Sequence, residues 1–152
     1  VDLNHNYDAM WQESKNAEAS YGIYGPGPTR YSGTSPESET ESKAVANLTR
    51  NNKFRLVIAY HTQGELIYWN FQNLANSEAR AIAIIFSQLS GYNLGETTGI
   101  TSYAGYKDWF IEKFRRPGYT IEVGLGQNPL PISQFNKIYS DNIKVLLEGA
   151  TI

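Results

Sequence analysis

The stretch Phe54-Arg55-Leu56-Val57-Ile58-Ala59-Tyr60-His61 decides the fold of this 152-residue chain. Its side chains are almost continuously apolar, whereas a strand with one face in water alternates apolar and polar residues. Such a run is typical of a strand that is buried on both faces of a sheet. A second, shorter strand is predicted over residues 119–123, where Tyr-Thr-Ile-Glu-Val precedes Gly124.

The remaining periodic segments predict helices. Residues 77–90 carry apolar side chains at helical spacing, and Gly91 provides a stop signal directly after them. Helices are also predicted over residues 36–51, 106–114 and 132–147. Because strands alternate with helices, the predicted fold class is α/β: a three-layer sandwich with a mixed, largely parallel sheet.

The ends of two of these helices are predicted from local signals. Ser35 is expected to cap the helix over residues 36–51, with Pro36 at its first position. Its apolar stripe would consist of Ala44, Val45 and Leu48. Pro131 is expected to lead into the last helix and Gly149 to close it.

Residues 16–35 are predicted to form a loop, because glycines and prolines crowd between Tyr21, Tyr24 and Tyr31. A long irregular stretch in a compact domain is usually functional or wraps the surface. The pattern fits a functional loop and a merely packed loop of tyrosines and prolines equally, so both interpretations stay open.

Composition excludes several classes of protein. The formal net charge is −2 and the longest basic run is Arg115-Arg116, which disfavours a nucleic-acid partner. Cysteine is absent, which excludes disulfide frameworks, thiolate zinc sites and cysteine nucleophiles. No apolar run is long enough to cross a bilayer, so no membrane partner is expected. The length is that of one domain, and the ordered-looking opening from Val1 suggests a piece of a longer polypeptide.

Polar residues at the carboxyl ends of strands are the candidate site, because ligands of α/β sheets collect there. These residues are Asn4 with His5, His61, and Glu122. His61 directly follows the buried strand, where a satisfied structural histidine is the competing interpretation. Glu122 lies in a short apolar strand, where burial would raise its pKa as a general base requires. An ion pair with an arginine is the structural alternative for this carboxylate.

Four segments in order resemble the zinc carboxypeptidase family, the funnelin metallopeptidases. They look like the family's D-x-N-R-N-[FW] segment, its S-E-x-E helix, the strand with its third zinc ligand, and its D-W…E spacing. The segments are Asp2-Leu3-Asn4-His5-Asn6-Tyr7, Ser38-Glu39-x-Glu41, Ala59-Tyr60-His61-Thr62-Gln63, and Asp108-Trp109 with Glu122 14 residues after Asp108. The resemblance covers nearly the whole chain.

Within the family, the chain looks most like the bacterial γ-D-glutamyl-L-diamino-acid endopeptidases. Three segments carry this likeness: His-Thr-Gln-Gly-Glu-Leu-Ile-Tyr-Trp from His61, Ala-Gly-Tyr-Lys-Asp-Trp-Phe-Ile from Ala104, and Arg-Pro-Gly-Tyr-Thr-Ile-Glu-Val-Gly from Arg116. Those enzymes cut peptidoglycan stem peptides between γ-D-glutamate and meso-diaminopimelate. The resemblance therefore implies a murein stem peptide as partner, and a bacterial wall, extracellular or spore-associated setting.

The resemblance also implies a role for each matching residue. His61 becomes a zinc ligand and Glu122 the general base. Asn4 and His5 match the pair that holds the substrate's terminal carboxylate, although His5 stands where the family has arginine and lacks its bidentate fork. For the family's substrate-capping tyrosine, the resemblance offers Tyr103 as the candidate.

The family's first two zinc ligands come from an upstream H-x-x-E motif that this chain does not contain. The chain has two histidines, and His5-x-x-Asp8 is a poor substitute because it overlaps the substrate segment. We therefore expect residues 1–152 to be the C-terminal part of a zinc carboxypeptidase-like catalytic domain. The complete enzyme with Zn²⁺ is expected to be active and this piece alone inactive.

Two alternatives to a peptidase remain at this point. The chain could be a pseudo-enzyme module that binds a peptide or glycan, which His5 in place of arginine favours slightly. It could also be a plain α/β domain with accidental matches. In the main interpretation part of the sheet is missing, so self-association through an exposed sheet edge is expected.

Overall fold

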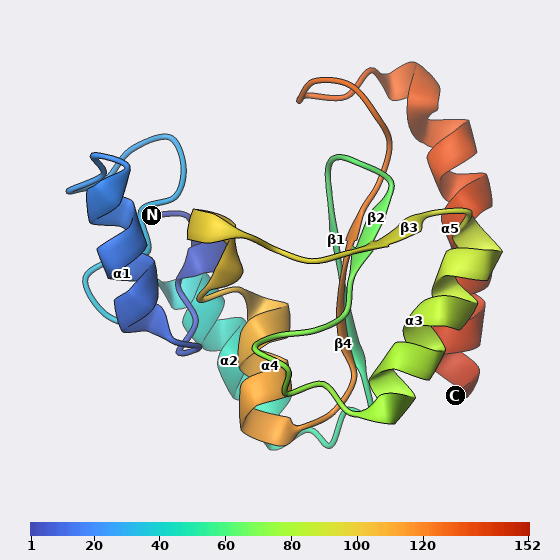
Figure 1. The fold of residues 1–152 in the computed structure, drawn as a ribbon, viewed down its shortest axis with the longest axis horizontal. Helices are drawn as coiled ribbons and strands as arrows, with labels where there is room; N and C mark the ends of the chain where they lie inside the picture. Colours follow the sequence, from blue (N-terminus) through green and yellow to red (C-terminus); the bar gives the residue numbers. More distant parts are fainter.

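The computed structural model describes residues 1–152 and contains one mixed sheet between two layers of helices (Figure 1). Its strands are β1 (Val57–His61), β2 (Leu66–Tyr68), β3 (Asn93–Gly95) and β4 (Gly118–Glu122). Their order in the sheet is β1-β4-β2-β3. The pairs β1/β4 and β2/β3 are parallel, and β2/β4 is antiparallel. The predicted mixed, largely parallel α/β sandwich is confirmed.

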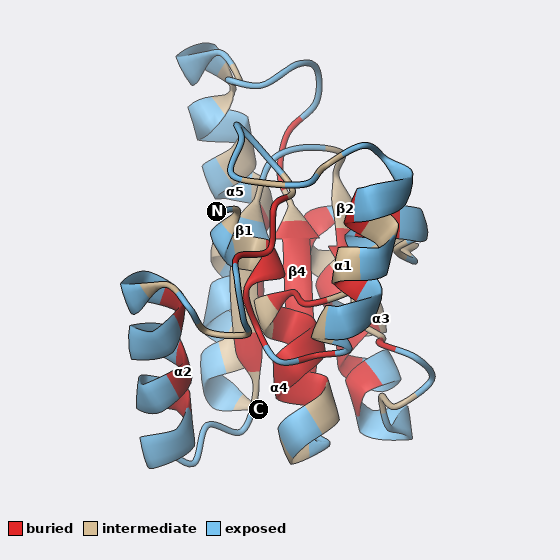
Figure 2. Ribbon diagram, turned by 90° about the vertical axis from the view of Figure 1, so that its left-hand side faces the viewer, coloured by how far each residue is buried: buried red, intermediate tan, exposed pale blue.

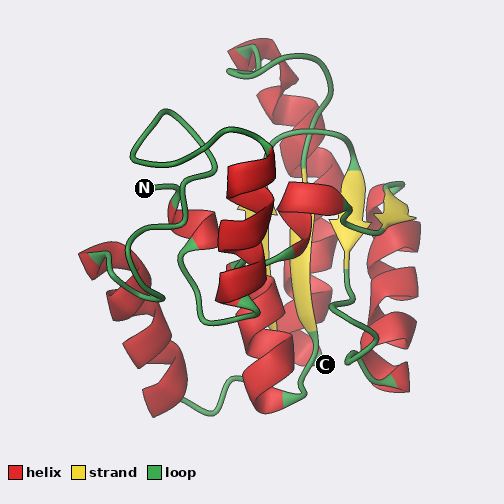
Figure 3. Ribbon diagram, turned by 60° about the vertical axis from the view of Figure 1, so that its left-hand side comes forward, coloured by secondary structure: helices red, strands yellow, loops and turns green.

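The helices are divided between the two faces of the sheet (Figures 1 and 3). One face is covered by α3 (Ser77–Ser90) and α5 (Phe135–Thr151). On the other side lie α1 (Trp11–Ser20), α2 (Thr40–Asn51) and α4 (Tyr106–Phe114). Short 3-10 turns at Leu3–His5, Gly99–Ser102 and Ile132–Gln134 complete the elements. No helix is both long and apolar enough to cross a membrane.

Each face of the sheet has its own apolar core. Tyr119 and Ile121 of β4 are fully buried in the core beneath α3 and α5. Val57 of β1 belongs to the second core, which is built around the fully buried Trp109 of α4. Figure 2 shows β4 buried along almost its whole length between the two layers. The alternate residues of β4 that do not enter the first core therefore face the side of α4.

Two helices agree with the sequence prediction to the residue. In α3 the Asn76 side chain accepts a hydrogen bond from the Ala79 backbone N–H at 2.8 Å, which caps the first turn. Gly91 ends this helix with φ of 79°, the left-handed conformation that glycine adopts without steric cost. The boundaries of α4 are also those predicted.

The predicted start of α2 is wrong. The helix begins at Thr40, and Glu37 has φ of 53°, which no helix from residue 36 could contain. Ser35 therefore does not cap it. The predicted apolar stripe is also wrong: Ala44, Val45 and Leu48 are exposed, while α2 buries Ser42, Ala46 and Thr49. The buried face of α2 is made of small and hydroxyl side chains, which hydropathy does not identify.

The predicted loop over residues 16–35 begins too early, because α1 extends to Ser20. This helix has no apolar stripe, and the residues that it buries are Ser14 and Glu18. Glu18 accepts hydrogen bonds from the Ser32 backbone N–H and from Lys15, both at 2.7 Å. Polar anchoring of this kind leaves no hydrophobic periodicity to detect.

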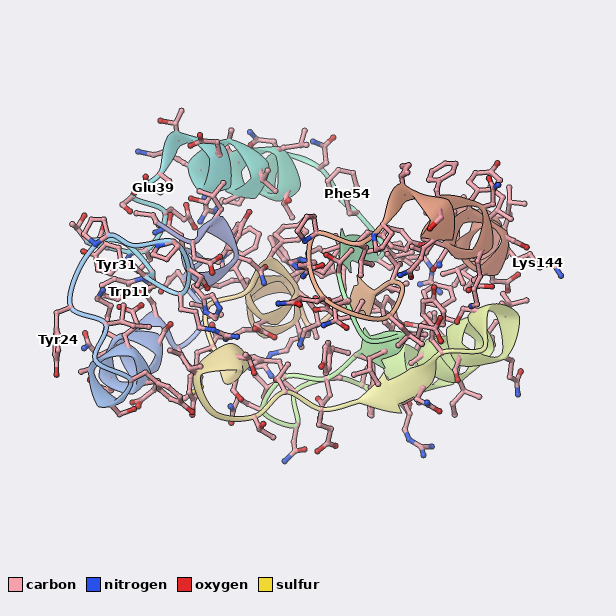
Figure 4. All side chains as sticks on the ribbon, turned by 90° about the horizontal axis from the view of Figure 1, so that it is seen from above. Trp11, Tyr24, Tyr31, Glu39, Phe54 and Lys144 are labelled. Atoms are coloured by element: carbon pink, nitrogen blue, oxygen red, sulfur yellow. The ribbon has the colours of Figure 1, made fainter.

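The rest of the segment over residues 16–35 packs against α1 at one end, and its tip is exposed to solvent. Tyr31 is buried, and Lys15 lies over its ring with the ammonium 4.0 Å from the ring centroid. Figure 4 shows Trp11 and Tyr31 close together, while Tyr24 projects away from the body of the molecule. Tyr24 is accordingly 82% exposed.

Three further predictions, for β1, β4 and α5, are wrong. Strand β1 is an edge strand, with Tyr60 39% exposed, so it is not buried on both faces. Strand β4 begins and ends one residue earlier than predicted. Helix α5 continues through Gly149, where a Cβ would lie 3.1 Å from Ile58 Cδ1. That glycine allows close packing of α5 on the sheet and does not end the helix.

Candidate active site

The ends of β1 and β4 place His61 beside Glu122. The two strands are parallel, and these residues are register partners at the last position of both. Partners in a parallel pair project from the same face, with the strands about 4.8 Å apart. Both residues are half-buried. An imidazole and a carboxylate that lie 61 residues apart in sequence thus share one sheet edge.

A polar cavity of about 470 Å³ lies at this edge. Its lining includes Asn4, His5, His61 and Glu122, which are four of the five residues predicted from sequence. The ends of two strands and the N-terminal segment converge there, as expected for ligand sites outside the carboxyl ends of strands. Tyr103 is not in the lining. It packs against the core of α4 instead, so its substrate role stays a prediction without support from its position.

Hydrogen bonds of the N-terminal segment position Asn4 and His5. The Asp2 carboxylate accepts from the Asn4 backbone N–H at 3.3 Å and starts the short turn Leu3–His5. The Asn4 side-chain oxygen accepts from the backbone N–H of Tyr106 at 3.4 Å, which ties the segment to the start of α4.

Side-chain hydrogen bonds of Asn6 hold the neighbouring segments together. It is fully buried, and its amide group donates to the Ser32 carbonyl at 2.7 Å and to Ser38 Oγ at 3.0 Å. Its oxygen accepts from Ser42 Oγ at 2.5 Å and from the Glu39 N–H at 3.1 Å. One asparagine therefore joins the N-terminal segment, the loop before α2 and the first turn of α2. Sequence reasoning did not identify this role.

The titratable groups of the cavity are shifted by burial. Burial raises the pKa of the Glu122 carboxyl above its ordinary value. Burial also lowers the pKa of His61, an effect that nearby Asp2 opposes and His5 reinforces. His5 is 7% exposed and its pKa is likewise lowered by burial. The two imidazoles are therefore held in the neutral form, and Glu122 is a stronger base than an exposed glutamate.

Besides Asp2, three charged residues of the lining were not among the site residues predicted from sequence. Lys107 and Asp108 form a buried ion pair with the ammonium 2.5 Å from Asp108 Oδ1. Lys107 also donates to the Asn70 carbonyl at 2.7 Å. Arg30, from the loop after α1, is the third. Lys107 adjoins the Asp108-Trp109 pair and could have been suspected from it, whereas nothing in the sequence around Arg30 distinguishes it.

His61 suits a zinc ligand, because its imidazole is neutral and half-buried at the cavity, whereas His5 is only 7% exposed. No group of three or more His, Asp or Glu side chains is arranged to hold a metal ion. A catalytic zinc takes about three protein ligands. The residues of this chain therefore fit one position of such a site and do not complete it.

A second cavity of about 500 Å³ lies at the opposite ends of β1 and β4. Its charged lining residues are Lys53, Arg55, Glu78, Arg115 and Arg116. The single carboxylate, Glu78, is paired with Arg55 at 2.6 Å. This cavity thus lacks an available base, and we do not consider it an active site.

Comparisons with known proteins identify the family to which the sequence is similar. A model of the family described as zinc carboxypeptidase matches residues 1–145. γ-D-Glutamyl-L-diamino acid endopeptidase 1 of Lysinibacillus sphaericus is 46% identical over 151 residues, which are 98% of this chain and 36% of that protein. The uncharacterized protein YqgT of Bacillus subtilis is 40% identical over 146 residues, which are 96% of this chain and 38% of that protein.

Solved structures share the fold. Bovine thrombin-activatable fibrinolysis inhibitor, in its complex with tick carboxypeptidase inhibitor, matches with a TM-score of 0.72 at 20% identity. The match covers 98% of this chain and 55% of that one. The chain thus spans about half of that structure and less than two-fifths of either bacterial relative.

Proposed function

The chain belongs to the zinc carboxypeptidase family, and on this premise we propose that it is the C-terminal part of the catalytic domain of a zinc peptidase. His61 provides one zinc ligand, and Glu122 is the general base. Asn4 and His5 line the substrate side of the cavity, and Tyr103 is the candidate for capping the substrate. The other zinc ligands come from residues outside these 152.

The observation that carries the proposal is the register of β1 and β4. It pairs His61 with Glu122 at the rim of a polar cavity. A structural histidine or a structural ion pair needs no such arrangement, and Glu122 has no ion-pair partner in the chain. An unpaired, half-buried carboxylate at a cavity is costly to the fold, and proton transfer accounts for it.

Zinc, when bound, would supply a Lewis acid that polarises the scissile carbonyl and acidifies a water. Glu122 takes a proton from the water and passes it to the leaving amine. Because burial raises its pKa, Glu122 is better suited to both steps than an exposed glutamate. His61 keeps its ring nitrogens available because burial disfavours its protonation.

We propose peptide bonds between γ-D-glutamate and meso-diaminopimelate in murein stem peptides as the substrate. The support is the 46% identity to an endopeptidase named for γ-D-glutamyl-L-diamino acid bonds. A bacterial wall, extracellular or spore-associated setting follows from such a substrate.

A pseudo-enzyme that binds peptides or glycans is the second candidate function. His5 favours it, because a buried neutral imidazole replaces the arginine of the family motif. Against it stands the pairing of His61 with Glu122, which peptide binding alone does not require.

Substitution of Glu122 by glutamine in the full-length protein distinguishes these candidates. Removing the base should lower kcat on a murein tripeptide by about 10²–10⁴-fold, the typical contribution of general acid–base catalysis. The zinc content should not change, because Glu122 is no ligand. Glu112→Gln is the matched control, since Glu112 lies on α4 outside the cavity lining. Near-normal turnover in Glu122→Gln would remove this residue from its role, and absence of turnover in the unmodified protein would favour the pseudo-enzyme.

A further inference from the structure

One positively charged side chain of the cavity has no ion-pair partner within the chain. Lys107 and Asp108 neutralise each other in a buried ion pair. The two oxygens of Asp2 accept from the backbone N–H groups of Asn4 and Arg30. The guanidinium of Arg30 is the exception among the cavity's permanent cations, because Arg30 takes part in none of the chain's ion pairs.

The backbone at Arg30 is held in an unusual conformation. Its φ is 69°, in the left-handed region that favours glycine. Its N–H donates to Asp2 Oδ2 at 2.9 Å, and the Asp2 N–H donates to the Tyr31 carbonyl at 2.7 Å. Such strain persists only where the surroundings enforce it, and it is concentrated at ligand-binding positions.

The attachment of the loop beyond Arg30 is equally firm. The buried carboxylate of Glu18 accepts from the Ser32 N–H at 2.7 Å, and the Trp11 indole donates to the Ser32 carbonyl at 3.0 Å. The loop thus presents Arg30 to the cavity from a fixed backbone. The N-terminal segment that carries Asn4 and His5 is held to the same loop by the hydrogen bonds of Asp2.

His5 cannot provide a positive charge in the same place. It is 93% buried, since its exposed fraction is 7%, and its Nδ1 is buried without a hydrogen-bond partner. A buried imidazole with no carboxylate bonded to it remains neutral. The guanidinium of Arg30 offers two parallel N–H donors to a carboxylate.

We propose that Arg30 is the residue that binds a carboxylate of the substrate in this cavity. The inference rests on the proposed function and deepens it. It limits the substrate class to peptides with a free carboxylate close to the scissile bond. It also explains how the cavity recognises an anion although His5 is neutral.

Binding of a murein tripeptide tests the proposal without turnover. The probe is L-alanyl-γ-D-glutamyl-meso-diaminopimelate, together with analogues in which each carboxyl group is amidated in turn. Affinities are measured by isothermal titration calorimetry with the full-length protein carrying Glu122→Gln, so that no peptide is cleaved. Cleavage of the tripeptide by the unmodified protein is assayed separately, and its failure would concern the proposed function instead.

We expect one amidated analogue to bind at least about tenfold more weakly than the free tripeptide, as loss of a charge-assisted pair of about 1.4 kcal/mol or more requires. Arg30→Gln should weaken the free tripeptide by a similar factor and leave that analogue unaffected. Arg30→Lys should restore only part of the affinity, because it keeps the charge without the fork. Arg80→Gln, on the exposed side of α3, should change nothing.

Equal weakening of all peptides by Arg30→Gln would overturn the proposal, because it would indicate a structural role for the loop. No weakening, or no binding of the tripeptide to the parent protein, would overturn it as well. Arg30→Asn is the second variant, because asparagine tolerates positive φ. It separates loss of the guanidinium from loss of the loop conformation.

Discussion

Both histidines of the chain line the same cavity, and burial lowers the pKa of each. For His5, nearby Asp2 and Asp108 favour the charged form, while Arg30 disfavours it. Burial is the largest effect and decides the direction. The folded protein therefore resists protonation of His5 at a pH where the unfolded chain accepts the proton.

The stability of the fold should depend on pH through this residue. A group with a lowered folded pKa contributes stability that is present above its unfolded value, about 6.5 for histidine, and is lost as the pH falls. The loss is at most about 1.4 kcal/mol per pH unit for one proton. Between neutral pH and pH 5, His5→Gln should therefore lose less unfolding free energy than the unmodified chain in urea titrations.

The raised pKa of Glu122 changes the unfolding free energy in the opposite sense on acidification. Because Glu122 is present in both proteins, the comparison isolates the contribution of His5. His61→Gln is the companion variant, since its pKa is lowered by burial as well. Parallel pH curves for His5→Gln and the unmodified chain would show that His5 titrates alike in the folded and unfolded states.

At the scale of elements, the ends of the helices differ in how they are determined. Helix α3 ends at Gly91, where the left-handed φ of 79° is required by the turn and no atom lies within 4 Å of an added Cβ. Helix α2 starts at Thr40 because the hydrogen bonds of Asn6 hold the preceding residues in another conformation. The first end is a local property and the second is imposed from a distance.

Gly91→Ala should therefore cost about 1 kcal/mol of unfolding free energy, since the penalty is purely conformational. The matched control is Gly27→Ala. Gly27 has no positive φ and only distant neighbours, so this variant should be neutral. Thermal or urea unfolding of both variants measures the difference, and an equal cost for the two would argue against a conformational origin.

At the scale of the whole molecule, the free edge of β1 and the surface beside it are unusual. Strand β1 pairs only with β4, so its other edge carries unpaired backbone groups. Next to it lies a hollow of about 230 Å³, mainly apolar, with Leu3, Tyr7, Ala59 and Tyr106 in its lining. An open edge beside apolar surface is the arrangement that pairs with another chain.

We expect isolated residues 1–152 to self-associate through this edge. Light scattering after size-exclusion chromatography should show a mass that rises with concentration. Leu3→Lys and Tyr60→Lys, at positions 40% and 39% exposed, should shift the protein towards monomer by about tenfold in dissociation constant, since a charge at an open edge opposes pairing.

Leu147→Lys is the control, because Leu147 is 63% exposed on α5, on the other face of the sheet. A monomer at every concentration, without binding of a hydrophobic dye, would contradict the prediction. If association is unaffected by Leu3→Lys but weakened by Leu147→Lys, the contact surface is on α5 instead.

Much of the fold was predictable because it depends on short-range signals. The apolar run before His61 gives β1, and the spacing of apolar residues with Gly91 gives α3 to the residue. Strands β2 and β3 were not predicted, since three residues each are too few for any periodicity. Helix α1 was missed because it is anchored by Glu18, a buried charge that no hydropathy pattern marks.

The sequence by itself determined the fold class, the family resemblance, and the candidates Asn4, His5, His61 and Glu122, because these depend on residue types in a fixed order. Tertiary structure alone decided that His61 and Glu122 are register partners, that Tyr103 lies outside the cavity and that Arg30 lies within it. The physical reason is that strand register and loop attachment come from hydrogen bonds between residues far apart in sequence. Sequence patterns do not reveal those hydrogen bonds. The chemical role of single residues could therefore be predicted, but which residues lie together in the cavity could not.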